Sequence, residues 1–108
     1  MTGEYLTVKL FELVGEFAED KNKAKEIREG TILPAIEERR LVVLDFDKVN
    51  SATQSFIHAL ISEAMRRKGA AALDFLRFKN CNEVVREIIS IVVAYMQAPP
   101  QSHNGNGA

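Results

Sequence analysis

Apolar residues alternate with polar ones over residues 6–10, which is the pattern of a β-strand with one buried face. This first strand could extend through Phe11 and Leu13. A second run, residues 41–46, is apolar on both faces, which is typical of a central parallel strand covered by helices on both sides. A third strand, also covered on both faces, is expected over residues 71–78.

Apolar residues at helical spacing follow each of these strands. The first helix begins after Asp20, a suitable N-cap, and we expect Gly30 and Pro34 to interrupt it because an interior proline costs about 3 kcal/mol. The second helix is expected to end at Gly69. Asn80, with a glutamate three residues later, resembles the start of a third helix. The apolar positions of that helix are Val84, Val85, Ile88, Ile89, Val92, Tyr95 and Met96.

The order of strand, helix, strand, helix, strand, helix predicts a small α/β domain. We expect a sheet of three to four strands, joined by right-handed crossovers and packed by about three helices. One domain should span residues 1–97. Residues 98–108 contain Pro, Gln, Ser, Asn and Gly with nothing to bury, so we expect a disordered tail.

Composition and charge exclude several classes of protein. The chain has 14 basic and 15 acidic residues and no extended basic stripe, which disfavours binding to nucleic acid. Cys81 is the single cysteine, so it forms no internal disulfide and no zinc site, as in proteins of a reducing compartment. No signal-peptide pattern and no apolar run of about 18 residues is visible. A cytoplasmic protein without membrane partners is expected.

The loop between the second strand and the second helix is the best candidate for a functional site, because ligands of α/β sheets bind beyond the carboxyl ends of the strands. Thr53 and Ser55 fall at the start of the helix, where unpaired N–H groups and the helix dipole favour an anion. A phosphate could be attached or bound there. The candidate contacts for a partner are Asp47, Asn50, Ser51, Gln54 and His58.

Two alternatives use the same residues. Ser51 and Gln54 match a capping box, so the loop hydroxyls could serve only to cap the helix. Ser55 and His58 share one side of the helix and, with Asp45, could form a small-ligand site or an enzyme site. Catalysis also needs an orienting group and an oxyanion site, which one helix turn does not supply, so we expect no enzyme.

Other residues suggest two further functions. Asp45 and Asp47 share a face and could hold magnesium, but the first strand supplies no acidic pair, so we expect no metal and no cofactor. Ile91 and Val93 widen the apolar surface of the last helix, which could serve a homodimer or a homo-oligomeric structural subunit.

Three short motifs, over roughly residues 5–96 of the chain, resemble the bacterial STAS-like domain family of unknown function, a relative of the anti-sigma-factor antagonists. They are Leu44-Asp45-Phe46-Asp47-Lys48-Val49, Ala52-Thr53-Gln54-Ser55-Phe56 and Phe78-Lys79-Asn80-Cys81. The resemblance implies a small STAS-like sheet packed by helices and a regulatory role through protein–protein interaction.

In the anti-sigma-factor antagonists, a hydroxyl at the start of this helix is phosphorylated by a partner kinase that also sequesters a sigma factor. The resemblance places that hydroxyl on Ser55, with Thr53 in place of the loop aspartate and Phe56 in place of a glycine. It implies a histidine-kinase-type ATPase as the partner. A phosphate adds about −1.5 to −2 charge, which would repel an acidic partner surface.

Overall fold

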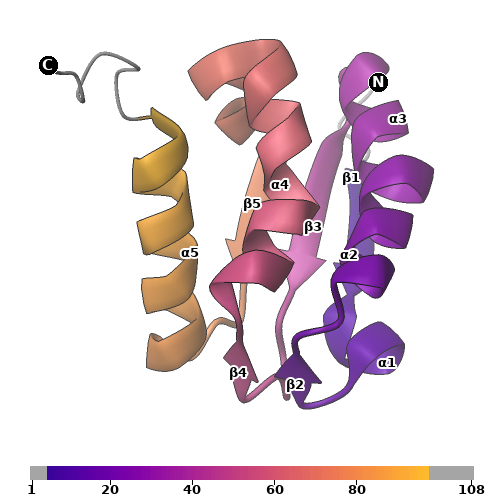
Figure 1. The fold of residues 1–108 in the computed structure, drawn as a ribbon. Coiled ribbons are helices and arrows are strands. Elements are labelled where there is room, and N and C mark those ends of the chain that lie inside the picture. The colour runs from indigo at the N-terminus through magenta and orange to yellow at the C-terminus, as the bar shows by residue number, and fades with distance from the viewer. Residues whose placement is uncertain (1–4, 98–108) are drawn as a thin grey trace, which may run out of the picture.

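Three parallel strands form the main sheet of the computed structural model, which describes residues 5–97. Strand β3 (Leu41–Asp45) lies between β1 (Tyr5–Lys9) and β5 (Leu76–Lys79), and pairs with both (Figure 1). The predicted α/β class and the central, parallel position of the second strand are therefore confirmed. The tail expected at residues 98–108 lies outside the described residues.

Short and long helices alternate with these strands, and a second small sheet lies beyond the carboxyl end of the main one. The helical segments are α1 (Leu10–Val14), α2 (Lys21–Ile27), a π-helical turn (Arg28–Ile32), α3 (Leu33–Glu37), α4 (Gln54–Lys68), a 3₁₀ segment (Gly69–Phe75) and α5 (Glu83–Gln97). The small parallel sheet pairs β2 (Phe17–Ala18) with β4 (Ser51–Ala52).

The helices that pack on the main sheet lie on one of its faces (Figure 1). Val42 and Leu44 of β3 point into the core on that side, whereas Thr7 and Arg77 of the flanking strands are exposed on the other. The expectation that helices cover both faces is therefore wrong. Val43 pairs with both Thr7 and Arg77 and is only 9 % exposed. A central strand is sheltered by its neighbours, so it can be apolar on both faces without a second helical layer.

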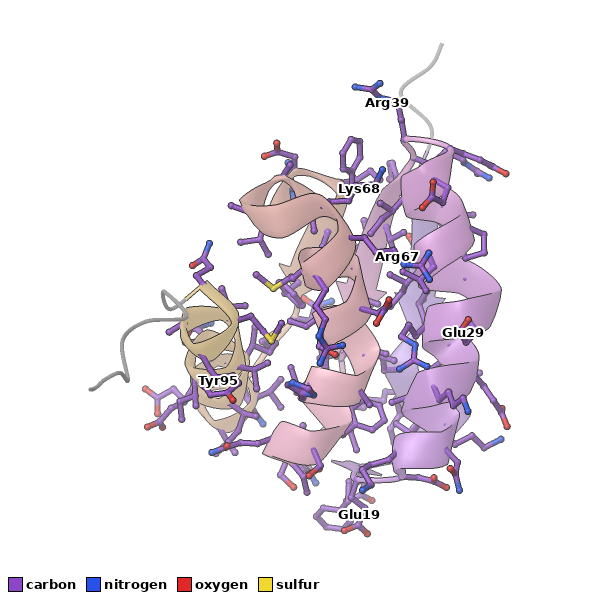
Figure 2. The ribbon with its side chains drawn as sticks, turned by 45° about the horizontal axis from the view of Figure 1, so that its top comes forward. Glu19, Glu29, Arg39, Arg67, Lys68 and Tyr95 are labelled. Atoms are coloured by element: carbon purple, nitrogen blue, oxygen red, sulfur yellow. The ribbon has the colours of Figure 1, made fainter. Side chains whose placement is uncertain are left out.

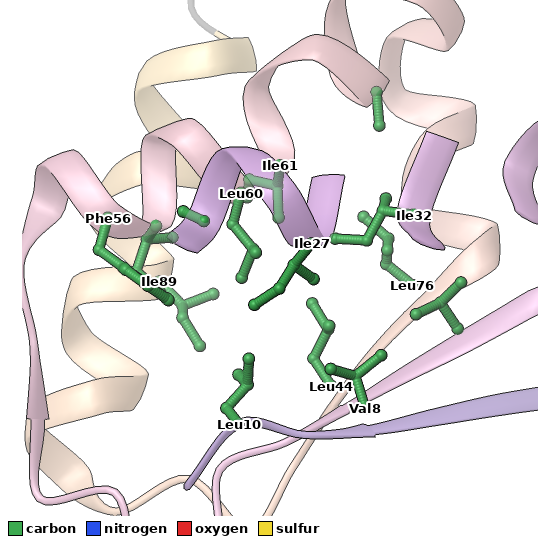
Figure 3. Close-up of a cluster of buried hydrophobic side chains, with 14 of the residues drawn as sticks. Val8, Leu10, Ile27, Ile32, Leu44, Phe56, Leu60, Ile61, Leu76 and Ile89 are labelled. Carbon is green, nitrogen blue, oxygen red and sulfur yellow. The ribbon is translucent and has the colours of Figure 1, made fainter. Parts of the chain in front are cut away.

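The core lies between the helices and the strands (Figure 3). Its labelled side chains come from both layers and are Val8, Leu10, Ile27, Ile32, Leu44, Phe56, Leu60, Ile61, Leu76 and Ile89. Each large side chain buried in this way contributes about 1.5–3 kcal/mol. At the surface, Arg67 of α4 (labelled in Figure 2) forms two salt bridges. Its Nε lies 3.1 Å from the carboxylate of Glu63, and its Nη1 lies 3.7 Å from that of Glu37 in α3.

Two expected strand boundaries are wrong. The first strand does not extend through Phe11 and Leu13, because the chain turns into α1 at Leu10, whose side chain is completely buried. The third strand begins at Leu76 and not at residue 71, because the preceding residues form a 3₁₀ segment that packs against α4. In both places the apolar residues of a helical turn adjoin those of the strand, so the sequence alone does not mark the boundary.

Three predicted helix signals are confirmed. Asp20 caps α2 by accepting hydrogen bonds from the N–H groups of Asn22 (2.9 Å) and Lys23 (3.3 Å). The expected interruption near Gly30 and Pro34 is confirmed as the π-helical turn that leads into α3. Gly69 ends α4 at a φ of 63°, a conformation that glycine adopts without strain.

Candidate functional site

Asp45 ends β3 and is buried at the start of the loop. Its carboxylate accepts hydrogen bonds from the side-chain amide of Asn80 (2.9 Å) and the backbone N–H of Asp47 (3.0 Å). These two bonds hold the pKa of Asp45 below its usual value, against the opposing effect of burial, and nearby Lys79 and Lys9 lower it further. Asp45 therefore stabilises the turn as an ionised group.

A tight turn follows, in which the backbone N–H of Val49 donates to the carbonyl of Phe46 over 2.9 Å. Phe46 and Val49 are both buried, and Lys48 between them has a φ of 73°. The Lys48 ammonium lies 5.7 Å from the centre of the Phe11 ring. Two buried anchors thus fix the turn, while Asp47 and Lys48 stay exposed.

The rest of the loop is held from two sides. The backbone N–H of Asn50 donates to the Glu16 carbonyl, and the side-chain amide of Asn50 donates to the Glu16 carboxylate. Each of these two hydrogen bonds is 2.8 Å long. The N–H of Thr53 donates to the Ala18 carbonyl over 3.0 Å. From the other side, the Asn82 amide donates to the Asn50 carbonyl over 2.9 Å. Asn50 is therefore both an exposed candidate contact and part of the loop's support.

Helix α4 is capped by Thr53, whose hydroxyl accepts a 3.0 Å hydrogen bond from the N–H of Phe56. The alternative that a loop hydroxyl caps the helix is confirmed for Thr53, but the capping box at Ser51 and Gln54 is wrong. Ser51 pairs with Phe17 in the small parallel sheet, so the chain is still extended there and the helix begins only at Gln54. Phe56 is completely buried and anchors the first turn, which leaves Gln54 and Ser55 exposed beside it.

The third helix also begins at a different asparagine from the one expected. Asn82 caps α5 by accepting a 2.8 Å hydrogen bond from the N–H of Val85. Asn80 instead has a φ of 59° and directs its side chain to Asp45. Between them, Cys81 is half-buried, and burial raises the pKa of its thiol despite the opposing charge of Arg86. A reactive thiolate at this helix start is not favoured.

The exposed start of α4 forms one wall of a groove of about 470 Å³. That wall carries Gln54, Ser55 and His58, the opposite wall comes from Ile91 and Tyr95 of α5, and Lys21 of α2 completes the lining. The centres of the His58 and Tyr95 rings are 6.4 Å apart, with the ring planes tilted by 60°. The groove thus brings together three sequence-predicted residues from α4.

Lys21 and Tyr95 were not predicted as site residues. Tyr95 counts among the apolar positions of the last helix in the sequence, but it is 72 % exposed. The signal that could have found it was the excess of apolar residues on that helix, which is more than one buried stripe requires. Lys21 is brought to the groove by the packing of α2 on α4.

Asp45 lies apart from Ser55 and His58. It lines a smaller cavity of about 110 Å³ together with Lys9, Glu12, Asp47 and Lys48. Ser62, one turn after His58 on α4, is 3 % exposed and therefore buried. The three residues of the enzymatic alternative are thus not assembled at one place. Among residues 5–97 there is no group of three or more His, Cys, Asp or Glu side chains that could hold a metal ion.

A family model described as a STAS-like domain of unknown function matches residues 23–86. The match includes β3, the loop, α4 and β5, but not Lys21 or Tyr95. No curated protein and no solved structure matches the chain significantly. Over residues 5–97, no helix combines the length and the apolar character needed to cross a bilayer.

Proposed function

Because this chain belongs to the family of STAS-like domains of unknown function, we propose that it is a regulatory domain that binds another protein through the start of α4. The observation that carries the proposal is the contrast between a firmly held loop and the exposed side chains of Thr53, Gln54 and Ser55 that follow it. A preorganised surface of this kind binds with little loss of conformational entropy.

The finer proposal is that Ser55 accepts a phosphate from a partner ATPase of the histidine-kinase type, in the cytoplasm. The resemblance to the anti-sigma-factor antagonists supports this assignment. So does the exposure of Ser55 in the first turn of α4, where the helix dipole favours the added negative charge. Thr53 is the weaker candidate because its hydroxyl already accepts the hydrogen bond that caps the helix.

The test is the intact mass of the protein recovered from its own cells, before and after phosphatase treatment. Loss of the mass of one phosphate from the wild type, and no such loss from Ser55→Ala, supports Ser55 as the acceptor. Thr53→Ser is the matched control, since it keeps both the cap and a hydroxyl. A wild type without phosphate under several growth conditions would refute the phosphorylation, and would leave the start of α4 as an unmodified contact surface.

The groove favours one alternative, a small ligand bound between Ser55, His58 and Tyr95. We propose binding rather than catalysis for any such ligand, because Asp45 lies in a different cavity. Mass spectrometry of the protein under native conditions distinguishes the two functions: a retained small molecule favours the ligand site. A homodimer built on α5 would appear as a doubled mass in sedimentation equilibrium.

A further inference from the structure

The two walls of the groove differ in chemistry. The wall from α5 is apolar, with Ile91 42 % exposed and Tyr95 72 % exposed. The side chain of Tyr95 is labelled on α5 in Figure 2. The wall from α4 is polar, with Ser55 and His58. A binding partner that fits this groove must therefore offer an apolar group to one wall and polar groups to the other.

The apolar wall belongs to a second stripe along α5. The first stripe, Val85, Ile89 and Val92, is buried against the core. Ile91 and Tyr95 are spaced four residues apart on another side of the helix, where no described residue buries them. Tyrosine is one of the residues that contribute most to binding energy at protein interfaces. This stripe is therefore suited to contact an apolar anchor.

The charge in the groove is positive or neutral. Lys21 lines it, His58 adds a second basic group, and none of the described lining residues is acidic. Lys23 and Arg28, on the same helical stretch, lie within 4.0 Å of Glu26 and Glu29. Lys21 takes part in no such salt bridge between described residues, so its charge is available to a partner.

We propose that the groove between α4 and α5 is the docking site for an acidic segment of the partner protein that carries one apolar anchor. The anchor packs on Ile91 and Tyr95, and a carboxylate of the segment pairs with Lys21. This inference rests on the proposed function and specifies the chemistry of its partner. It also gives the phosphate a direct effect: phosphorylated Ser55 would place negative charge in the groove and repel an acidic segment.

The experiment is photocrosslinking in the cells that produce the protein. One variant carries a photoreactive phenylalanine analogue in place of Tyr95, and a second carries it in place of Ser55. Both positions are exposed, so the fold should tolerate the analogue, and thermal unfolding checks this. Sequencing of the peptide crosslinked through position 95 should identify a segment with net negative charge and an apolar residue at or beside the attachment point.

Charge variants then test the role of Lys21. Lys21→Glu should lower the yield of the crosslink at position 95 by about fivefold, the effect of about 1 kcal/mol. Lys25→Glu is the matched control, because Lys25 is exposed one turn along the same helix and does not line the groove. Equal yields from the two variants would overturn the proposal.

The remaining outcomes separate this inference from the proposed function. Crosslinks through position 55 but not 95 would refute the groove and leave the start of α4 as a contact surface. A crosslink through position 95 to a basic segment, or to a second copy of this chain, would also refute an acidic partner. No crosslink through either position would count against both proposals.

Discussion

The side-chain amide of Asn80 donates a 2.9 Å hydrogen bond to the carboxylate of Asp45, and so joins the carboxyl ends of β3 and β5. The hydrogen bonds from Asn80 and Asp47 hold the pKa of Asp45 below its usual value of about 3.8. A carboxyl group with a lower pKa in the folded state than in the unfolded state stabilises the fold above pH 3.8 or so. That contribution is lost as the pH falls through the folded-state pKa.

Replacement of Asp45 by asparagine should remove this pH-dependent contribution. At pH 7 we expect Asp45→Asn to lower the free energy of unfolding by about 1.5–3 kcal/mol, the usual range for hydrogen bonds to a charged group. The difference in free energy of unfolding between this variant and the wild type should become smaller below pH 3.8, as measured by urea unfolding from pH 7 to pH 3. Asp47→Asn, an exposed neighbour, is the control and should change stability by less than about 0.5 kcal/mol. A difference in free energy of unfolding that stays the same at every pH would contradict the prediction.

Asn82 both caps α5 and supports the loop, so its replacement should remove two stabilising interactions. Asn82→Ala should lower the free energy of unfolding by about 1–2 kcal/mol in chemical denaturation. Asn82→Asp keeps the capping acceptor but loses the amide donor to the Asn50 carbonyl, so it should recover only the capping part. Asn22→Ala, on the exposed surface of α2, is the matched control and should be nearly neutral. An Asn82→Ala variant as stable as that control would rule out this double role.

Thr53 and Ser55 should differ in their effect on stability although both are exposed hydroxyls at the start of α4. Thr53→Ala should cost about 1 kcal/mol because the N–H of Phe56 loses its acceptor, and Thr53→Ser should restore most of it. Ser55→Ala should leave the thermal unfolding midpoint nearly unchanged. If Ser55→Ala proves the more destabilising, the cap has been assigned to the wrong residue.

Substitution of glycine by alanine should destabilise the fold at Gly69 but not at Gly30. A Cβ at either position would meet no atom within 4 Å, so the difference lies in the backbone alone. Gly69 has a φ of 63° and a ψ of −149°, a region almost confined to glycine, so Gly69→Ala should cost about 1–3 kcal/mol. Gly30 lies in the π-helical turn without a positive φ, so Gly30→Ala should be neutral or stabilise by up to about 1 kcal/mol. Similar unfolding midpoints for the two variants would contradict this account.

The sequence predicted those parts of the fold whose signals are local. The apolar run of β3, the Asp20 cap and the Gly69 stop each depend on a few adjacent residues. The strand boundaries at Leu10 and Leu76 were missed because the helical turns there are also rich in apolar residues and adjoin the strands directly. The loop pairing that moved the cap from Ser51 to Thr53 depends on a distant segment, residues 16–18.

The candidate site was predictable on one wall only. The order of strand, loop and helix placed Ser55 and His58 at the start of α4, where the structure has them. Lys21 and Tyr95 come from other helices, and their side chains reach the groove only through the packing of α2 and α5 against α4. The sequence also grouped Asp45 with Ser55 and His58, because it could not show that the loop turns the helix start away from the end of β3.

The strand order also constrains how the chain folds. Since β3 pairs with both β1 and β5, each strand pairing must join segments separated by a helical crossover, as Tyr5 with Leu41 and Val42 with Leu76. Pairings of this kind carry a large loop-closure entropy and slow the folding rate. We therefore expect the helices to form early in folding and the strands to pair late. The rate-limiting step should depend on β3, because both strand pairings of the main sheet include it.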